Sequence, residues 1–132
     1  MSRRQLDPPD APLTKAMAAA AALFDGGLYF EVHEYLEPFW IRAEGGARQS
    51  LQGLIQAAVG FQHLANGNAA GARALLHEAC ARLGDGMLVG RELQAFALGL
   101  RRCLDAVVAL GPHAASGFDW TTVPRFPVGA ID

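Results

Sequence analysis

The residues best suited to chemistry lie in two segments of a chain that is otherwise poor in charge. Residues 29–40, YFEVHEYLEPFW, hold a histidine and three glutamates, and residues 51–63, LQGLIQAAVGFQH, add glutamines and a second histidine. The polar residues of interest are Glu31, His33, Glu34, Glu37, Gln52, Gln56 and His63. Because polar side chains are costly to bury unless they bond to one another, we expect the two sets to meet in the folded chain.

A metal site is one use for such a meeting. His33 and Glu37 are four residues apart, and Gln56 and His63 are seven residues apart. On a helix, the two residues of each pair would therefore lie on the same face. A short loop between the segments favours antiparallel helices, which would turn the two polar faces toward each other. His33, Glu37 and His63 would then offer two imidazoles and a carboxylate, a set that suits Zn or non-haem Fe.

Three features argue against a metal. Zinc proteases of the helical type have histidine where Glu37 stands. A di-iron site needs a glutamate three residues before each histidine ligand, and His63 has none at that spacing. Pro38 also disturbs the helix beside Glu37. We therefore predict no cofactor, and a metal-dependent hydrolase or a small-ligand-binding protein using His33, Glu37 and His63 is the alternative.

A structural role for the polar residues is the interpretation we favour. Metal-free catalysis with His33 or Glu34 as general base is a further option, but Ser2, Ser50 and Ser116 have no companion base in the sequence. Glutamate, glutamine and histidine can instead satisfy one another and the backbone groups left by Pro38, and so fix the helix register. This predicts an internal Glu/His/Gln network in a non-enzymatic structural or interaction module.

The elements that must position these residues are all helical. Apolar residues at helical spacing predict a compact all-α bundle of about five helices, at about residues 10–25, 28–43, 48–65, 69–83 and 91–110. Pro38 predicts a kink or a break, and Gly53 and Gly60 predict the close approach of another backbone. Residues 1–9 are expected to form a flexible arm, and residues 10–132 a single domain. After residue 111, prolines and aromatic residues predict an extended tail packed on the bundle or on a neighbouring subunit.

Composition excludes several partners. The chain has 132 residues, a net charge of −2 and 18% charged residues, so it lacks the basic face of a nucleic-acid binder. Its longest apolar run, residues 16–24, is far shorter than the roughly 20 residues of a membrane span.

Cys80 and Cys103 are expected as buried thiols in a reducing cytoplasm. The low charge is explained either by a homo-oligomer or by the high content of alanine and glycine.

The first polar segment also carries a family resemblance. The block FDGGLYFEVHEYLE at residues 24–37, with Trp40 close behind, resembles the signature of the DUF309 family of small helical proteins. The continuation LQGLIQAA at residues 51–58, with His63, Gly67-Asn68 and Gly71-Ala72, supports it over about residues 20–83. The resemblance implies a compact all-α fold in a cytoplasmic prokaryotic protein, and no assigned activity. The family's signature polar positions correspond to the polar residues named above, and Pro38 departs from the family's usual run.

Overall fold

The computed structural model describes residues 11–127 and confirms the all-α prediction. Its five long helices are α1 (Ala11–Asp25), α2 (Tyr29–Arg42), α3 (Gly45–Ala65), α4 (Ala69–Leu83) and α5 (Gln94–Leu110). A hairpin of two short strands, β1 (Met87–Leu88) and β2 (Arg91–Glu92), connects α4 to α5. The arm expected at residues 1–9 falls outside the described residues.

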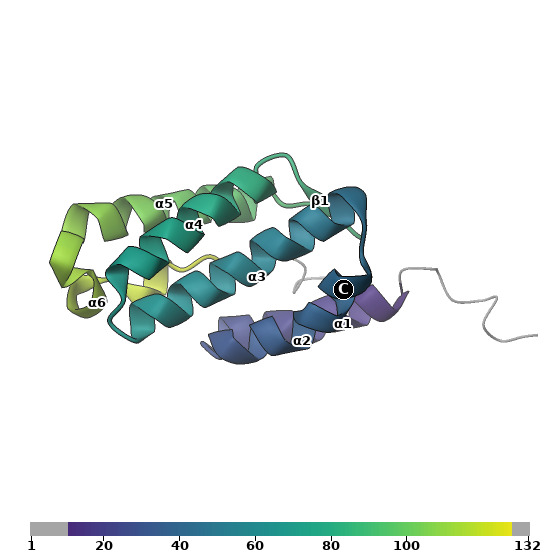
Figure 1. Ribbon diagram of the computed structural model, residues 1–132, viewed down its shortest axis with the longest axis horizontal. Helices are drawn as coiled ribbons and strands as arrows, with labels where there is room; N and C mark the ends of the chain where they lie inside the picture. Colours follow the sequence, from purple (N-terminus) through teal and green to yellow (C-terminus); the bar gives the residue numbers. More distant parts are fainter. Residues whose placement is uncertain (1–10, 128–132) are drawn as a thin grey trace, which may run out of the picture.

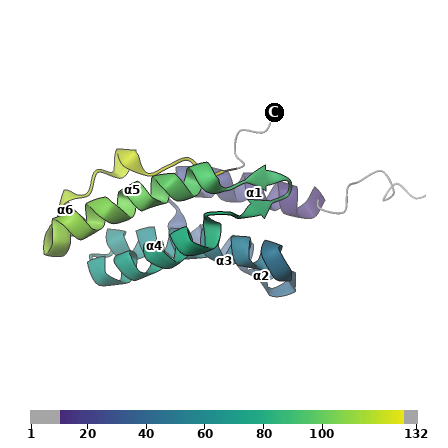
Figure 2. The same cartoon turned by 90° about the horizontal axis from the view of Figure 1, so that it is seen from above.

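The helices form two layers. In Figures 1 and 2, α2, α3 and α4 lie side by side in one layer, and α1 and α5 lie behind them in the other. Aromatic side chains join the layers: the ring of Phe24 on α1 lies 5.9 Å from that of Phe61 on α3 and 5.6 Å from that of Phe96 on α5. All three rings are buried, so the core lies between the layers and α2 has one face free.

The glycines of α3 allow close helix packing, as predicted, and the partner is α4. A Cβ atom placed on Gly53 would lie 2.7 Å from Leu83, and one on Gly60 would lie 3.2 Å from Leu76. Interiors packed at crystal density leave no room for an added methyl group at such distances. These two contacts therefore fix how α3 and α4 lie against each other.

Two helix starts differ from the prediction. Helix α3 begins at Gly45, because Glu44 is extended and Gly45 has a positive φ of 60° that turns the chain directly into the helix. Helix α5 begins at Gln94 because the preceding residues form the hairpin. Its two-residue turn, Val89-Gly90, has positive φ values of 44° and 78°, the geometry of a tight type I′ connection. Strands of two residues are too short to show alternation in a sequence.

Pro38 does not break α2, which runs without interruption from Tyr29 to Arg42. Proline removes the bond that its N–H would make to the carbonyl of Glu34. Both residues are exposed, so water can bond to that carbonyl. The helix therefore continues past the proline.

The tail after α5 packs against the bundle, as predicted, but it is not wholly extended. It contains three short helical turns, η2 (Gly111–His113), α6 (Ala114–Gly117) and η3 (Trp120–Thr122). Phe118 and Phe126 are buried. The carboxylate of Asp25 accepts hydrogen bonds from the backbone N–H of Phe126 at 3.0 Å and from Nε of Arg125 at 3.2 Å. The tail thereby ties the C-terminal part of the chain to the end of α1.

Both cysteines are free thiols in this fold. Cys103 is buried and Cys80 is partly buried, and burial raises the pKa of each thiol. Within residues 11–127, no helix combines the length and the apolar character needed to cross a membrane.

Candidate functional site

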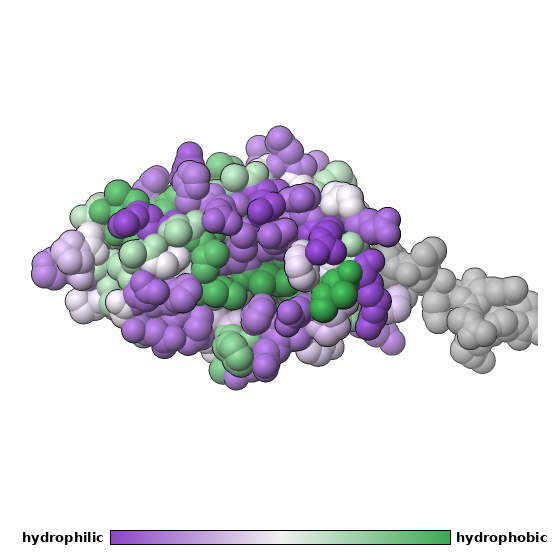
Figure 3. Space-filling model, viewed as in Figure 1, coloured by the Kyte–Doolittle hydropathy of each residue, from purple (hydrophilic) through white to green (hydrophobic). Residues whose placement is uncertain are grey.

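A groove between α2 and α3 brings together part of the predicted polar set. It encloses about 270 Å³ and is lined by His33, Glu37, Trp40, Gln52, Ile55 and Gln56. Figure 3 shows apolar surface along the line between these helices, bordered by hydrophilic side chains. The groove thus combines an apolar floor with carboxylate, imidazole and amide groups at its edges.

The α2–α3 connection positions this groove. Only Ala43 and Glu44 separate the helices, and such a short loop makes them antiparallel neighbours. The guanidinium of Arg48 lies 4.1 Å above the ring of Trp40, and its Nη1 donates to the Trp40 carbonyl at 3.4 Å. Trp40 is therefore held in place by α3 at one end of the groove.

His33 and Glu37 form a loose, accessible pair. The His33 Nε2 atom lies 3.9 Å from Oε1 of Glu37, and the two side chains are 34% and 48% exposed. This separation exceeds hydrogen-bond range, so the carboxylate keeps its capacity to accept bonds. Both groups are open to a partner in solvent.

Gln56 bonds to α4 and not to α2. Its Nε2 donates to Oε1 of Glu78 at 2.7 Å, and its Oε1 accepts from Nε of Arg82 at 3.0 Å. Neither Glu78 nor Arg82 was among the polar residues singled out from the sequence. Their spacing of four residues on α4 was the available signal.

His63 lies apart from the groove, at the turn between α3 and α4. Its Nδ1 is 3.2 Å from Nδ2 of Asn68, whose Oδ1 accepts from the backbone N–H of Gly71 at 2.9 Å. Asn68 is the N-cap of α4, so His63 supports a helix cap. The metal set of His33, Glu37 and His63 is not assembled, and across residues 11–127 no three His, Cys, Asp or Glu side chains gather closely enough to hold a metal ion.

The prediction of an internal network is wrong for α2. Glu31 and Glu34 are exposed and do not line the groove, and Glu37 is exposed at its edge. The apolar residues Tyr29, Val32 and Leu36 occupy the buried face of the helix. Since one turn of a helix places its residues on all sides, the glutamates between them must point outward.

The outward face of α2 is both apolar and acidic. Phe30 and Ile41 are 51% and 59% exposed, and helical spacing puts them on the same face as Glu34 and Glu37. This surface, Phe30, Glu34, Glu37 and Ile41, is called the outer face of α2 below. It runs along the edge of the groove through Glu37.

Trp40 supplies an unsatisfied donor to the site. Its indole Nε1 is the one buried side-chain nitrogen or oxygen without a hydrogen-bond partner in the described part of the chain. Buried polar groups are nearly always bonded, so an orphaned donor calls for an explanation. An acceptor brought by a bound partner would provide one.

The groove is equipped for binding more than for nucleophilic chemistry. Its lining contains no serine, threonine, cysteine or lysine among the residues that the structure describes. Carboxylate, amide and aromatic groups around an apolar floor instead select a partner with a cationic group and an apolar portion.

The fold and the groove define a small all-helical protein with a polar groove between its second and third helices. A family model, described as a domain of unknown function (DUF309), matches residues 17–75. The match covers both signature segments, so the resemblance to the DUF309 family is confirmed over this stretch of the chain. All the residues that line the groove lie within the match. Comparison with curated proteins and with solved structures finds no match.

Proposed function

We propose that this protein is an interaction module that binds a basic peptide segment of a partner protein along the outer face of α2 and the α2–α3 groove. The observation that carries the proposal is the groove itself. It opens beside a helix face whose exposed residues are of both apolar and acidic types.

Charge selects a basic partner. Glu31, Glu34 and Glu37 are all exposed on α2, and Arg42 at its C-terminal end is the only arginine or lysine of the helix. Opposite charges across an interface speed association and exclude partners of the wrong sign. Lysine or arginine side chains of the partner would lie beside these glutamates.

Apolar contacts and backbone bonds would supply the rest of the affinity. Phe30 and Ile41 can bury partner side chains against the outer face, and Ile55 can do so in the groove. A peptide also carries backbone carbonyls, and one of them could accept the unpaired N–H of Trp40 once the indole, whose Nε1 is buried, shifts toward the groove. A basic peptide with apolar residues therefore matches the exposed groups of the site.

Fluorescence anisotropy with two labelled peptides tests the proposal. The peptides share their apolar residues and differ only in carrying lysine and arginine or glutamate. The basic peptide is expected to bind, and more weakly as salt is added. Replacing both Glu34 and Glu37 with glutamine should weaken it roughly threefold to tenfold, since an exposed ion pair contributes about 0.2–1 kcal/mol.

A matched control is Glu92→Gln, which removes an exposed glutamate from β2, outside the groove. It should leave the affinity unchanged. Equal binding of the acidic peptide, or equal effects of the control and the double variant, would contradict the proposal.

Self-association is the competing use of the same surface. A homo-oligomer would cover Phe30 and Ile41 without any foreign peptide. Light scattering during chromatography distinguishes the two, because a monomer leaves the outer face free for the peptide.

A cytoplasmic location is part of the proposal, and cell fractionation tests it. The metal-dependent hydrolase gains no support from the geometry, since His63 bonds to Asn68 instead of lining the groove.

A further inference from the structure

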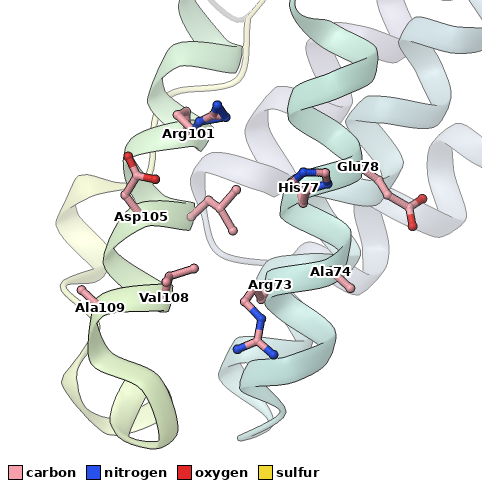
Figure 4. A pocket seen from close by; sticks show the side chains of 9 residues that line it. Arg73, Ala74, His77, Glu78, Arg101, Asp105, Val108 and Ala109 are labelled. Atoms are coloured by element: carbon pink, nitrogen blue, oxygen red, sulfur yellow. The ribbon is translucent and has the colours of Figure 1, made fainter.

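A second groove, between α4 and α5, is lined by charged side chains of both signs and by apolar residues. It encloses about 640 Å³, a volume typical of small-molecule sites. Figure 4 shows its two walls, with Arg73 and His77 on α4 and Arg101 and Val108 on α5. It shares no lining residue with the α2–α3 groove.

The two arginines of this groove are without acidic partners in the described chain. The ion pairs and hydrogen bonds there involve neither Arg73 nor Arg101. In Figure 4 the guanidinium of Arg101 extends from α5 toward α4, and that of Arg73 lies at the α4 wall. Unpaired guanidinium groups are strong, geometrically specific donors to carboxylate and phosphate.

Two carboxylates, those of Glu78 and Asp105, also line the groove, and neither forms an ion pair with these arginines. Glu78 is bonded to Gln56 of α3 at 2.7 Å and points away from α5 in Figure 4. Asp105 lies one helical turn after Arg101 on α5, and within residues 11–127 no ion pair or hydrogen bond joins the two. His77 adds a further nitrogen donor at the wall, so the unpaired donors of the groove can bind an anion.

The remaining lining is apolar. Leu104 extends from α5 into the groove, and Val108 follows one turn later with more than half of its side chain exposed. Ala74 and Ala109 leave room around them because their side chains are small. Leu104 is mostly buried, so Val108 is the apolar residue of this wall that would gain most from covering by a hydrocarbon chain.

We propose that the α4–α5 groove binds an amphipathic anion, a carboxylate or phosphate head group on a short apolar chain. Arg101, which extends toward His77, holds the head group, Arg73 adds positive charge one turn away on α4, and Leu104 and Val108 line the path of the chain. This inference goes beyond the proposed peptide binding and does not depend on it, because the residues and the sign of the charge differ.

Calorimetric titration with octyl phosphate and octanoate, both below their micelle concentrations, tests the site. Octanol and octyltrimethylammonium share the chain and lack the anion, and inorganic phosphate has the anion and lacks the chain. Either anionic amphiphile should bind at least about tenfold more tightly than all three controls, because head group and chain act together. Equal binding of octanol, of the ammonium compound or of inorganic phosphate would overturn the proposal.

Variants locate the binding. Replacing Arg73 and Arg101 together with glutamine should weaken octyl phosphate roughly tenfold or more. Arg102→Gln is the matched control, because Arg102 is an exposed neighbour on α5 that does not line the groove. Equal losses in the two proteins would overturn the assignment. All of these positions are exposed, so the variants should keep the thermal unfolding of the parent.

Binding to lipid vesicles distinguishes the two sources of the anion, a lipid head group in a membrane and a free amphiphile. Vesicles of phosphatidylcholine with phosphatidic acid, compared with pure phosphatidylcholine, show whether a lipid head group in a membrane is accepted. Arginine-dependent binding to the acidic vesicles supports a lipid source, and binding of octyl phosphate alone supports a free amphiphile. Binding of a single-stranded oligonucleotide with the same arginine dependence, at the affinity of octyl phosphate, would overturn the amphiphile.

Discussion

His63, Asn68 and Gly71 form a small unit that starts α4. The side chain of Asn68 accepts from the N–H of Gly71 and contacts the ring of His63. A Cβ atom on Gly71 would lie 2.6 Å from Nδ2 of Asn68, so a larger residue there would displace the cap. Three residues that resemble a family signature thus share a structural role.

Removing this cap should destabilise the protein. Asn68→Ala is expected to lower the free energy of unfolding by about 1 kcal/mol, as is typical for loss of an N-cap. Asn68→Ser should restore most of it, since a serine oxygen can accept from the same N–H. Urea unfolding measures both. A serine variant as unstable as the alanine variant would show that the contact with His63, and not the cap, carries the stability.

Buried thiols and a buried phenol make stability depend on alkaline pH. Burial raises the pKa of Cys80 and Cys103 above 9.0 and that of Tyr29 above 10.0. The folded state therefore retains these protons while the unfolded chain loses them. Their contribution is complete below about pH 9, where thiols are protonated in both states, and falls as the pH rises through the folded-state values.

The urea midpoint should accordingly fall between about pH 8.5 and pH 10.5, a range that spans the ordinary pKa values of 9.0 for the thiols and 10.0 for the phenol. In the double variant Cys80→Ala/Cys103→Ala the fall should be shallower, whatever its starting stability. An equally steep fall in parent and variant would assign the alkaline loss to other groups.

At the scale of the helix, α3 is held to α4 by contacts that leave no space. Gly53→Ala should lower the free energy of unfolding by about 1–3 kcal/mol, the range for overpacking a filled core, because its Cβ would meet Leu83 at 2.7 Å. Gly46→Ala is the control on the same helix, since nothing lies within 4 Å of its Cβ position. It should be neutral or stabilising by up to about 1 kcal/mol. A Gly53 variant as stable as the Gly46 variant would contradict this packing.

The helices were predictable from the sequence because burial repeats at every turn. The directions of individual polar side chains could be predicted less well from the sequence. Gln56 and His63 are aligned along α3, yet one bonds to α4 and the other to the turn that follows α3. That division depends on which helix packs at Gly53 and Gly60, and the sequence of α3 predicts a close approach there but not its partner. The antiparallel pairing of α2 and α3 did predict half of the groove, with His33 and Glu37 opposite Gln52.

At the scale of the whole molecule, the tail closes the bundle. The ring of Phe126 lies 5.2 Å from that of Phe24 and 5.8 Å from that of Phe96. Its proline-rich sequence predicted the packing, but the Asp25 contact joins residues a hundred positions apart and has no local signal. The tail therefore belongs to the core even though its sequence is irregular.

Phe126→Ala should lower the free energy of unfolding by about 3 kcal/mol, as for other buried phenylalanines. The neighbouring change Arg125→Ala removes only the ion pair between an exposed guanidinium and Asp25, worth less than about 1 kcal/mol. Thermal unfolding compares the two. Equal effects would mean that the tail is held by its charge and not by its aromatic residue.

The most direct test of peptide binding along α2 uses the two tryptophans of the chain. Trp40 lines the α2–α3 groove with an unpaired indole N–H, whereas Trp120 stacks on Tyr29 at 6.1 Å, among the aromatic residues of the tail. Both indoles give separate signals in a ¹H–¹⁵N correlation spectrum. As the basic peptide is added, the Trp40 signal and the backbone signals of Glu34 and Glu37 should shift together, while the Trp120 signal stays in place. Shifts confined to Trp120, or no shift at Trp40 when the peptide is bound, would contradict the proposal.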